Sequence, residues 1–255
     1  MIRLAALLLC LALPALGQTD VEERVVAGLS QNRVSITANF DGSEILIFGA
    51  VKREAPVFDV RHPLEVVVTV SGPSVPITVR RKEKKYGIWI NTDAVEVDLA
   101  PSFYAIATSG PFDTVLSSVE DLRHKVSIPR AIRSVGANIT GSEQFTEALI
   151  RIRTANDQYQ VLENTVLVTE ETLFDTSIAL PANLTEGHYA VRIFLTRGGQ
   201  IRDEYRTEIF VQKVGLERWI YNLAHERPLI YGLLSLAIAI AAGWGASAIF
   251  RYLRG

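Results

Sequence analysis

The feature that most constrains this chain is an uncharged stretch near its C-terminus. Leu229 to Phe250 are 22 residues without a charged side chain, preceded by Pro228 and followed by Arg251 to Gly255. At about 1.5 Å per residue, a helix of this length reaches roughly 33 Å, enough for one tilted crossing of a bilayer. A core helix of a globular protein rarely needs so long an uncharged run. We therefore predict one transmembrane helix over 229–250.

The N-terminus has the pattern of a secretory signal peptide. Arg3 supplies a positive start, Leu4 to Leu13 are almost uninterruptedly apolar, and Pro14 to Gly17 offer small residues for cleavage before Gln18. The apolar run is too short to span about 30 Å of hydrocarbon. We predict that residues 1–17 are removed and that the folded body lies outside the cytoplasm.

The charges that flank the uncharged stretch fit this orientation. Arg251 and Arg254 then fall on the cytoplasmic side, as the positive-inside tendency expects. Arg218 and Arg227 on the other flank weaken that argument, so the orientation depends mainly on the signal peptide. The cytoplasmic stub, 251–255, is too short to form a signalling domain.

The only cysteine, Cys10, lies inside the predicted signal peptide. The mature chain should therefore contain no thiol, which excludes disulfides, thiolate metal sites and cysteine nucleophiles. A body of about 200 residues is long enough to be stabilised by its hydrophobic core alone.

The predicted transmembrane helix has a face of small residues. At 100° per residue, the members of this face fall within one arc: Gly232, Ser235, Ala239, Ala242, Gly243 and Ala246. Such a stripe allows a second helix to approach closely, so these residues are candidates for pairing with a membrane-protein partner or with a second copy. The alternative is that alanine and glycine are simply common in membrane spans.

Short β-branched segments separated by turn residues run through the body. Arg33 to Phe40 alternates, Asp41-Gly42 supplies a turn and Glu44 to Val51 follows, which predicts a hairpin. Further strands are predicted over 64–70, 76–81, 87–91, 94–99 and 103–108. Many short strands of this kind are typical of an immunoglobulin-like β-sandwich, which we assign to residues 18–125.

The pattern changes after Pro111. Val115 to Lys125 is predicted to be helical, and Thr140 to Glu143 fits a capping box for an amphipathic helix near 143–154. Strands return over 165–169, 177–180, 189–196 and 205–211, the last two as a hairpin with a Gly198-Gly199 turn. We predict a smaller β-rich unit over 126–214 and an amphipathic juxtamembrane segment over 215–228.

The body shows no sequence motif for catalysis. Its histidines are far apart, and no metal-binding spacing, nucleophile elbow or phosphate-binding glycine loop occurs. We therefore expect no metal, no cofactor and no enzyme activity, although distant residues could still converge into a hydrolase site. All acidic residues lie between 18 and 227 and leave the body mildly acidic, which argues against nucleic-acid binding.

One segment concentrates positive charge on this acidic body. Five of the six residues from Arg80 to Lys85 are cations, and Tyr86 to Asn91 follow. The candidates for binding an anion or a partner are Arg80, Arg81, Lys82, Lys84, Lys85 and Trp89. They could meet anionic lipid headgroups, a small anion or an acidic partner. The alternative is a solvated hairpin whose lysines protect an edge strand, with Trp89 in the core rather than on a ligand.

A series of local motifs resembles one alphaproteobacterial family of transmembrane proteins. The motifs occur in the family's order: Val79 to Lys82, Gly87 to Asn91, Pro101 to Ala105, Leu173-Phe174, Leu180 to Ala182, Gly187 to Tyr189, Tyr231 to Leu233 and Gly243-Trp244. The resemblance covers nearly the whole chain. It implies a Gram-negative inner-membrane location with the body in the periplasm, and a neighbouring permease similar to sulfite exporters. It supplies no activity and no catalytic residues.

These observations favour a periplasmic accessory or interaction protein, tethered to the inner membrane beside an integral membrane partner. A second hypothesis is a membrane-tethered binding module for a small anion or glycan, using the cations between Arg80 and Lys85. A third is a hydrolase with a dispersed site, which would require a deep pocket with convergent titratable groups.

Overall fold

The computed structural model describes residues 23–37, 40–54, 61–133 and 142–254. The predicted signal peptide and the start of the predicted capping box at Thr140 lie outside these residues.

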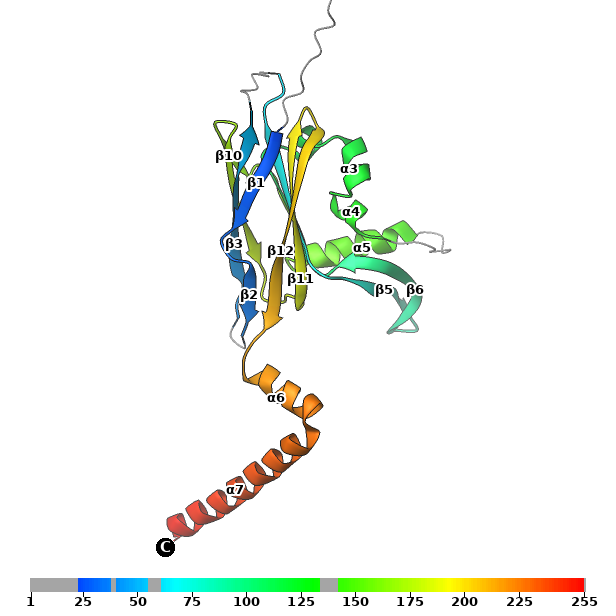
Figure 1. Cartoon of the computed structure of the whole chain (residues 1–255). Helices are drawn as coiled ribbons and strands as arrows, with labels where there is room; N and C mark the ends of the chain where they lie inside the picture. The colour runs from blue at the N-terminus through cyan, green and yellow to red at the C-terminus, as the bar shows by residue number, and fades with distance from the viewer. Residues whose placement is uncertain (1–22, 38–39, 55–60, 134–141, 255) are drawn as a thin grey trace, which may run out of the picture.

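Two β-sheets form the body (Figure 1). The four-stranded sheet has the order β1 (Glu23–Leu29), β3 (Ser43–Arg53), β10 (Leu173–Leu180) and β9 (Leu167–Thr169). The six-stranded sheet has the order β2 (Arg33–Ile36), β12 (Gln200–Lys213), β11 (Gly187–Arg197), β4 (Glu65–Ser71), β7 (Tyr104–Thr108) and β8 (Tyr159–Leu162). Strands from both predicted units, 18–125 and 126–214, therefore pair within each sheet.

The main core lies between these two sheets. Ile45, Ile47 and Phe174 from the four-stranded sheet pack in one cluster with Val68 and Ile193 from the six-stranded sheet. Because successive side chains of a strand point to opposite faces, β-branched residues at alternate positions fill this layer.

A second core covers the other face of the six-stranded sheet. Val67 and Phe194 of that sheet pack there against Leu116 and Leu149. The covering elements are α2 (Phe112–Val115), α4 (Ile128–Ala131), α5 (Ser142–Ala155) and the base of a separate hairpin formed by β5 (Ser74–Lys85) and β6 (Ile88–Pro101). Helix α3 (Ser118–His124) joins them through His124, whose ring lies 5.8 Å from that of Phe194. Strand β4 is buried on both faces from Val66 to Val70, which explains why four of these five residues are valines.

The prediction of a mostly β chain with a helical insertion is confirmed. In immunoglobulin constant-type domains, the first, second, fifth and fourth strands form one sheet, and the third, sixth and seventh form the other. The order β1-β3-β10-β9 opposite β12-β11-β4 follows a similar pattern, with the β5–β6 hairpin and the helices as insertions. The immunoglobulin-like assignment remains our interpretation of this order.

The predicted hairpin of 33–40 with 44–51 is wrong. Strand β2 pairs in parallel with β12, whereas β3 pairs with β1 and β10. The chain crosses from one sheet to the other between β1 and β2, where Phe210 donates its backbone N–H to the carbonyl of Asn32. Asp41-Gly42 is thus a connection between sheets rather than a hairpin turn. The separate strands predicted over 87–91 and 94–99 are one strand, β6.

Several other elements agree with the sequence prediction. Strands β11 and β12 form the predicted hairpin, and its two glycines adopt the positive φ angles that a tight turn requires, 55° at Gly198 and 75° at Gly199. Helix α5 occupies the place of the predicted amphipathic helix.

Two helices follow β12 at the C-terminus. They are α6 (Leu216–Glu226) and α7 (Pro228–Arg254). Within α7, residues Pro228–Ser247 are long and apolar enough to cross a membrane, and 0% of the apolar stretch is buried against the rest of the protein. In Figure 1 both helices extend away from the β-sheets.

Candidate functional site: the β5–β6 hairpin

The segment with the predicted binding residues forms a long, twisted hairpin beside the two main sheets (Figure 1). Lys85 pairs with Ile88, so Tyr86 and Gly87 form a two-residue turn with positive φ angles of 52° and 85°. Positive φ at both central residues is the signature of a type I′ turn, whose twist matches that of the strands. The register shifts twice, between Val75 and Ile77 and between Arg81 and Lys82, and such bulges bend a hairpin and increase its twist.

The base of the hairpin is built into the second core. Val97 and Ala100 are completely buried there. Tyr159 donates its hydroxyl to the carbonyl of Pro101 over 2.9 Å, and Arg153 donates to the same oxygen over 2.8 Å. Burial raises the pKa of Tyr159 to about 12, so this hydroxyl keeps its proton at neutral pH. The hairpin therefore projects from a rigid base.

The hairpin has an inner and an outer face. Val79 and Val95 lie opposite each other on the inner face, which continues into the second core. Two residues further along β5, Arg81 lies on that same face and donates to Gln144 of α5 over 2.9 Å, with its guanidinium 4.8 Å from the centre of the Phe145 ring. Arg81 therefore helps to hold the hairpin against α5.

The six-residue basic segment divides between these faces. Arg81 and Lys85 lie on the inner face, and each forms an ion pair there. Nη1 of Arg81 lies 3.7 Å from Oδ2 of Asp93, and Nζ of Lys85 lies 3.8 Å from Oε2 of Glu83. Arg80, Lys82 and Lys84 alternate with them and project from the outer face. Across the described part of the chain, these three outer cations make no side-chain hydrogen bond or ion pair. Of the predicted cations, these three are the ones available to an external anion.

The end of the hairpin is apolar and exposed. Tyr86 is fully exposed, and Ile88 and Trp89 expose 65% and 68% of their surface. Trp89 lies directly opposite Lys84, on the outer face. The interpretation of Trp89 as a core residue is therefore wrong, because the strand has left the core by that point. No local sequence pattern indicated that Tyr86 and Ile88 would join this exposed tip.

The other set of predicted residues lies on α7. Apart from the neighbouring backbone of α7 itself, a Cβ atom built at Gly232 or Gly243 would meet no atom of the described residues within 4 Å. The Ser235 hydroxyl donates to the carbonyl of Tyr231 over 2.6 Å within the helix. The pairing roles of Gly232, Ser235, Ala239, Ala242, Gly243 and Ala246 remain predictions.

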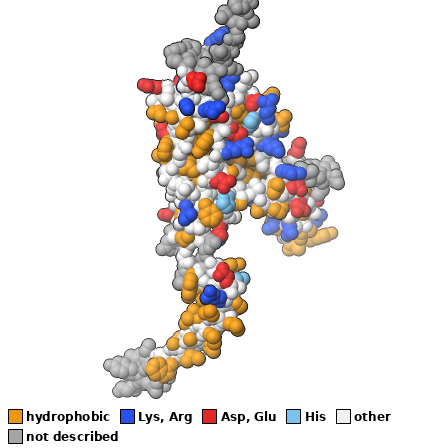
Figure 2. All heavy atoms as spheres, in the orientation of Figure 1, with side chains coloured by type: hydrophobic (Ala, Val, Ile, Leu, Met, Phe, Trp, Pro, Cys, Tyr) orange, Lys and Arg blue, Asp and Glu red, His pale blue; other side chains and the backbone are white. Residues whose placement is uncertain are grey.

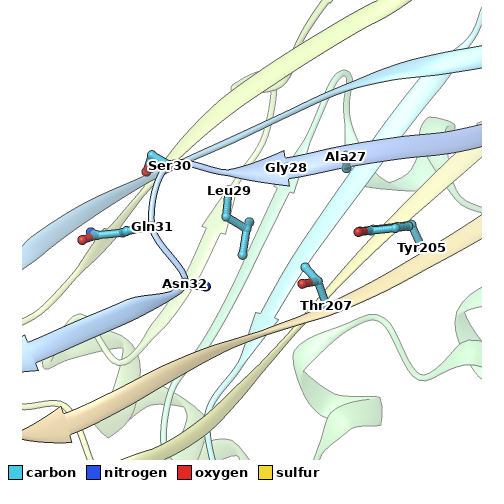
Figure 3. A pocket seen from close by; sticks show the side chains of 8 residues that line it. All are labelled: Ala27, Gly28, Leu29, Ser30, Gln31, Asn32, Tyr205 and Thr207. Atoms are coloured by element: carbon cyan, nitrogen blue, oxygen red, sulfur yellow. The ribbon is translucent and has the colours of Figure 1, made fainter.

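Two open hollows border the four-stranded sheet. One, of about 430 Å³, lies where β1 ends beside β12, and Figure 3 shows Leu29, Tyr205 and Thr207 pointing into it. The other, of about 540 Å³, lies over the outer surface of the sheet between Phe48 and Leu173. Neither hollow brings together an acid, a base and a nucleophile.

Among the described residues we also looked for side chains grouped as metal ligands. No group of three or more histidine, cysteine, aspartate or glutamate side chains is arranged there to hold a metal ion.

Comparison with known proteins gives one informative match. A family model described as "Putative transmembrane protein (Alph_Pro_TM)" matches residues 24–252. No curated protein matches the chain. Among solved structures, the crystal structure of Spo0M, a sporulation control protein from Bacillus subtilis, aligns with 12% identity and a TM-score of 0.27, and the match covers 75% of this chain and 49% of that one. The chain thus spans about half the length of Spo0M, and a similarity this weak indicates neither a shared fold nor a shared function.

Proposed function

This chain belongs to the Alph_Pro_TM family of transmembrane proteins, and from that membership we propose that it is a single-pass accessory protein of the inner membrane. In this proposal α7 crosses the bilayer and the β-rich body stands in the periplasm. The protein contacts an integral membrane partner through α7 and catalyses no reaction of its own.

The observation that carries the proposal is the exposure of α7. Its apolar stretch is 0% buried against the rest of the chain. An exposed apolar helix of this length is unfavourable in water, by about 25 cal/mol for each Å² of apolar surface, whereas lipid or a second helix solvates it. Helix α6, which precedes it, exposes Trp219 and Tyr221, side chains that favour the headgroup region.

A multi-span partner would fit this anchor. With α7 in the bilayer, its small-residue face offers close packing to a neighbouring helix. A permease similar to sulfite exporters is the partner that the family resemblance suggests.

Affinity purification of the full-length protein from mild detergent tests the proposal. We expect a multi-span protein to copurify. The Ala239→Leu/Gly243→Leu variant should lose it, whereas Leu236→Ile/Ile240→Leu, on another side of α7, should retain it. Recovery of the chain alone, or equal recovery of the partner with both variants, would argue against pairing through α7.

The second hypothesis, a binding module for a small anion or glycan, has less support. Arg81 is engaged by Gln144 and Asp93, and the three outer cations lie along one strand rather than around a pocket. Thermal-shift measurements on the full chain with inorganic phosphate or sulfate test it, and stabilisation that disappears in Arg80→Glu/Lys82→Glu would revive it. The third hypothesis, a hydrolase, would require a convergence of titratable groups that the two hollows lack.

A further inference from the structure

We propose that the outer face and the tip of the β5–β6 hairpin dock on the anionic lipid surface of the membrane that α7 crosses. The hairpin would give the body a second membrane contact, in addition to α7. The residues that carry this contact are Arg80, Lys82, Lys84, Tyr86, Ile88 and Trp89. The contact depends on the anchor of the proposed function but not on the identity of any protein partner.

The chemistry of the hairpin matches a membrane interface. Tyr86 and Trp89 combine large apolar rings with a polar group, and such side chains concentrate at the headgroup level of bilayers. Ile88 adds an aliphatic group at the same tip. The outer cations alternate along β5 and are attracted by the negative charge of anionic lipid. Apolar tip and basic stem thus follow one another, as acyl chains and phosphates do in a leaflet.

The turn itself suggests that its aromatic residue has a role outside the fold. Tyr86 has φ 52°, a conformation that glycine and asparagine adopt at less cost than tyrosine. Its ring is fully exposed, so packing within the chain does not compensate for this cost. A contact made outside the chain would explain a tyrosine at this position.

The placement of the hairpin agrees with this role. In Figure 1 the tip of the β5–β6 hairpin and the end of β12, from which the chain continues into α6 and α7, lie toward the same end of the body. Figure 2, in the same orientation, shows hydrophobic side chains gathered at the lower end of the part of the body that contains this hairpin. If α6 lies along the membrane surface, this end of the body faces the bilayer.

Protection of an edge strand does not account for the whole pattern. Lysines along β5 would discourage pairing with another chain. Three exposed apolar side chains at the tip would have the opposite effect, because they offer an apolar surface to other molecules. Lipid explains both features together.

The fluorescence of Trp89 in the full-length protein tests the proposal. The chain has three tryptophans, so Trp219→Phe/Trp244→Phe leaves Trp89 as the only reporter. The protein is reconstituted into vesicles of phosphatidylcholine, with or without phosphatidylglycerol. We expect the emission to shift to shorter wavelength, and to be quenched by brominated lipid, only when phosphatidylglycerol is present. Raising the salt concentration should reverse both effects without any change in the hairpin.

A charge-reversal variant tests the outer cations. Arg80→Glu/Lys82→Glu/Lys84→Glu should abolish the shift and the quenching. The matched control, Arg33→Glu/Lys52→Glu/Arg151→Glu, changes three exposed cations elsewhere by the same amount and should leave both unchanged. Thermal unfolding shows whether both variants are folded. If the hairpin variant is unfolded, the salt dependence of the Trp89 emission in the protein with an unchanged hairpin tests the role of the cations instead.

Other outcomes would overturn the proposal. Unchanged Trp89 emission in phosphatidylglycerol vesicles would show that the hairpin does not reach the lipid. An equal shift in phosphatidylcholine alone would remove the role of the cations. If inorganic phosphate produced the emission shift in phosphatidylcholine vesicles, the hairpin would be a site for a free anion. If only a copurified protein produced the shift, the hairpin would be a site for an acidic protein partner. Loss of the protein from the vesicles altogether would instead contradict the anchor.

Discussion

Arg197 in β11 holds Glu23 in β1 through two hydrogen bonds, from Nε to Oε2 over 2.8 Å and from Nη2 to Oε1 over 2.9 Å. Arg197 is 5% exposed and Glu23 is 6% exposed, so the pair is shielded from solvent. Arg197 also donates to the carbonyl of His62 and to Glu171. Because β1 and β11 belong to different sheets, this pair joins the two layers of the body.

Removing the arginine should destabilise the body strongly. Arg197→Met leaves the Glu23 carboxylate buried; among the described residues Arg53 then lies 3.7 Å from it, and breaking a buried pair costs about 3–5 kcal/mol. Glu23→Leu/Arg197→Met should recover most of this loss, since no unpaired charge remains. Thermal unfolding of the full chain in mild detergent measures both. An Arg197→Met variant as stable as the parent would show that the pair contributes little.

The attachment of the hairpin to α5 can be tested at Arg81. Arg81→Ala removes the hydrogen bond to Gln144 and the contact with the Phe145 ring, so we expect a loss of about 1 kcal/mol in the free energy of unfolding. Lys82→Ala, one residue along on the outer face, should change it by less than about 0.5 kcal/mol. Equal effects of the two substitutions on thermal unfolding would contradict the division of the cations between two faces.

Replacing Tyr86 should stabilise the turn and weaken the membrane contact. Tyr86→Asn places a residue that tolerates positive φ at the position with φ 52°, so unfolding should become harder by about 1 kcal/mol. The same variant should weaken the Trp89 response to phosphatidylglycerol. Gly87→Ala, the control, should lower stability, because φ 85° is unfavourable for alanine. A stabilised Tyr86→Asn protein with an undiminished lipid response would remove Tyr86 from the contact.

Glu65 should make stability depend on pH. Burial raises the pKa of this carboxyl in the folded protein above its ordinary value of 4.5. Stability is therefore greater while the group is protonated, and part of it is lost as the pH rises from below the unfolded pKa through the folded pKa. Glu65→Gln removes this loss, so its advantage over the parent should grow across that window and persist at pH 7. Thermal unfolding from pH 4 to pH 7 measures it.

Glu96→Gln serves as the control for this pH series, because Glu96 is an exposed residue on β6. It should show no comparable growth in stability. If the difference in stability between Glu65→Gln and the parent were the same at every pH, burial of the carboxyl would not be its cause.

Local patterns in the sequence predicted elements better than they predicted pairing. The β11–β12 hairpin was predictable because Gly198 and Gly199 join two adjacent strands. Strand β2 was not, since its partner β12 follows more than 150 residues later and pairs in parallel. Alternation shows which residues share a face of a strand, but it does not show which strand lies beside it.

The candidate site was predictable only in part. The run of cations is visible in the sequence, but the division into an engaged inner pair and three outer cations depends on α5, where Gln144 and Phe145 hold Arg81. Trp89 resembles a core residue because strand tryptophans commonly pack inside. It is exposed because the hairpin extends beyond the second core, a length that no local pattern reveals.

The most direct test of membrane anchorage by α7 is the behaviour of the native protein in cell fractions. We expect it to stay in the membrane pellet after washing with alkaline carbonate, and we expect protease added outside spheroplasts to digest the body. A variant that ends before Pro228 should be released as a soluble protein. Extraction of the full-length chain by carbonate, or a body protected from external protease, would contradict a membrane-anchored protein whose body faces the periplasm.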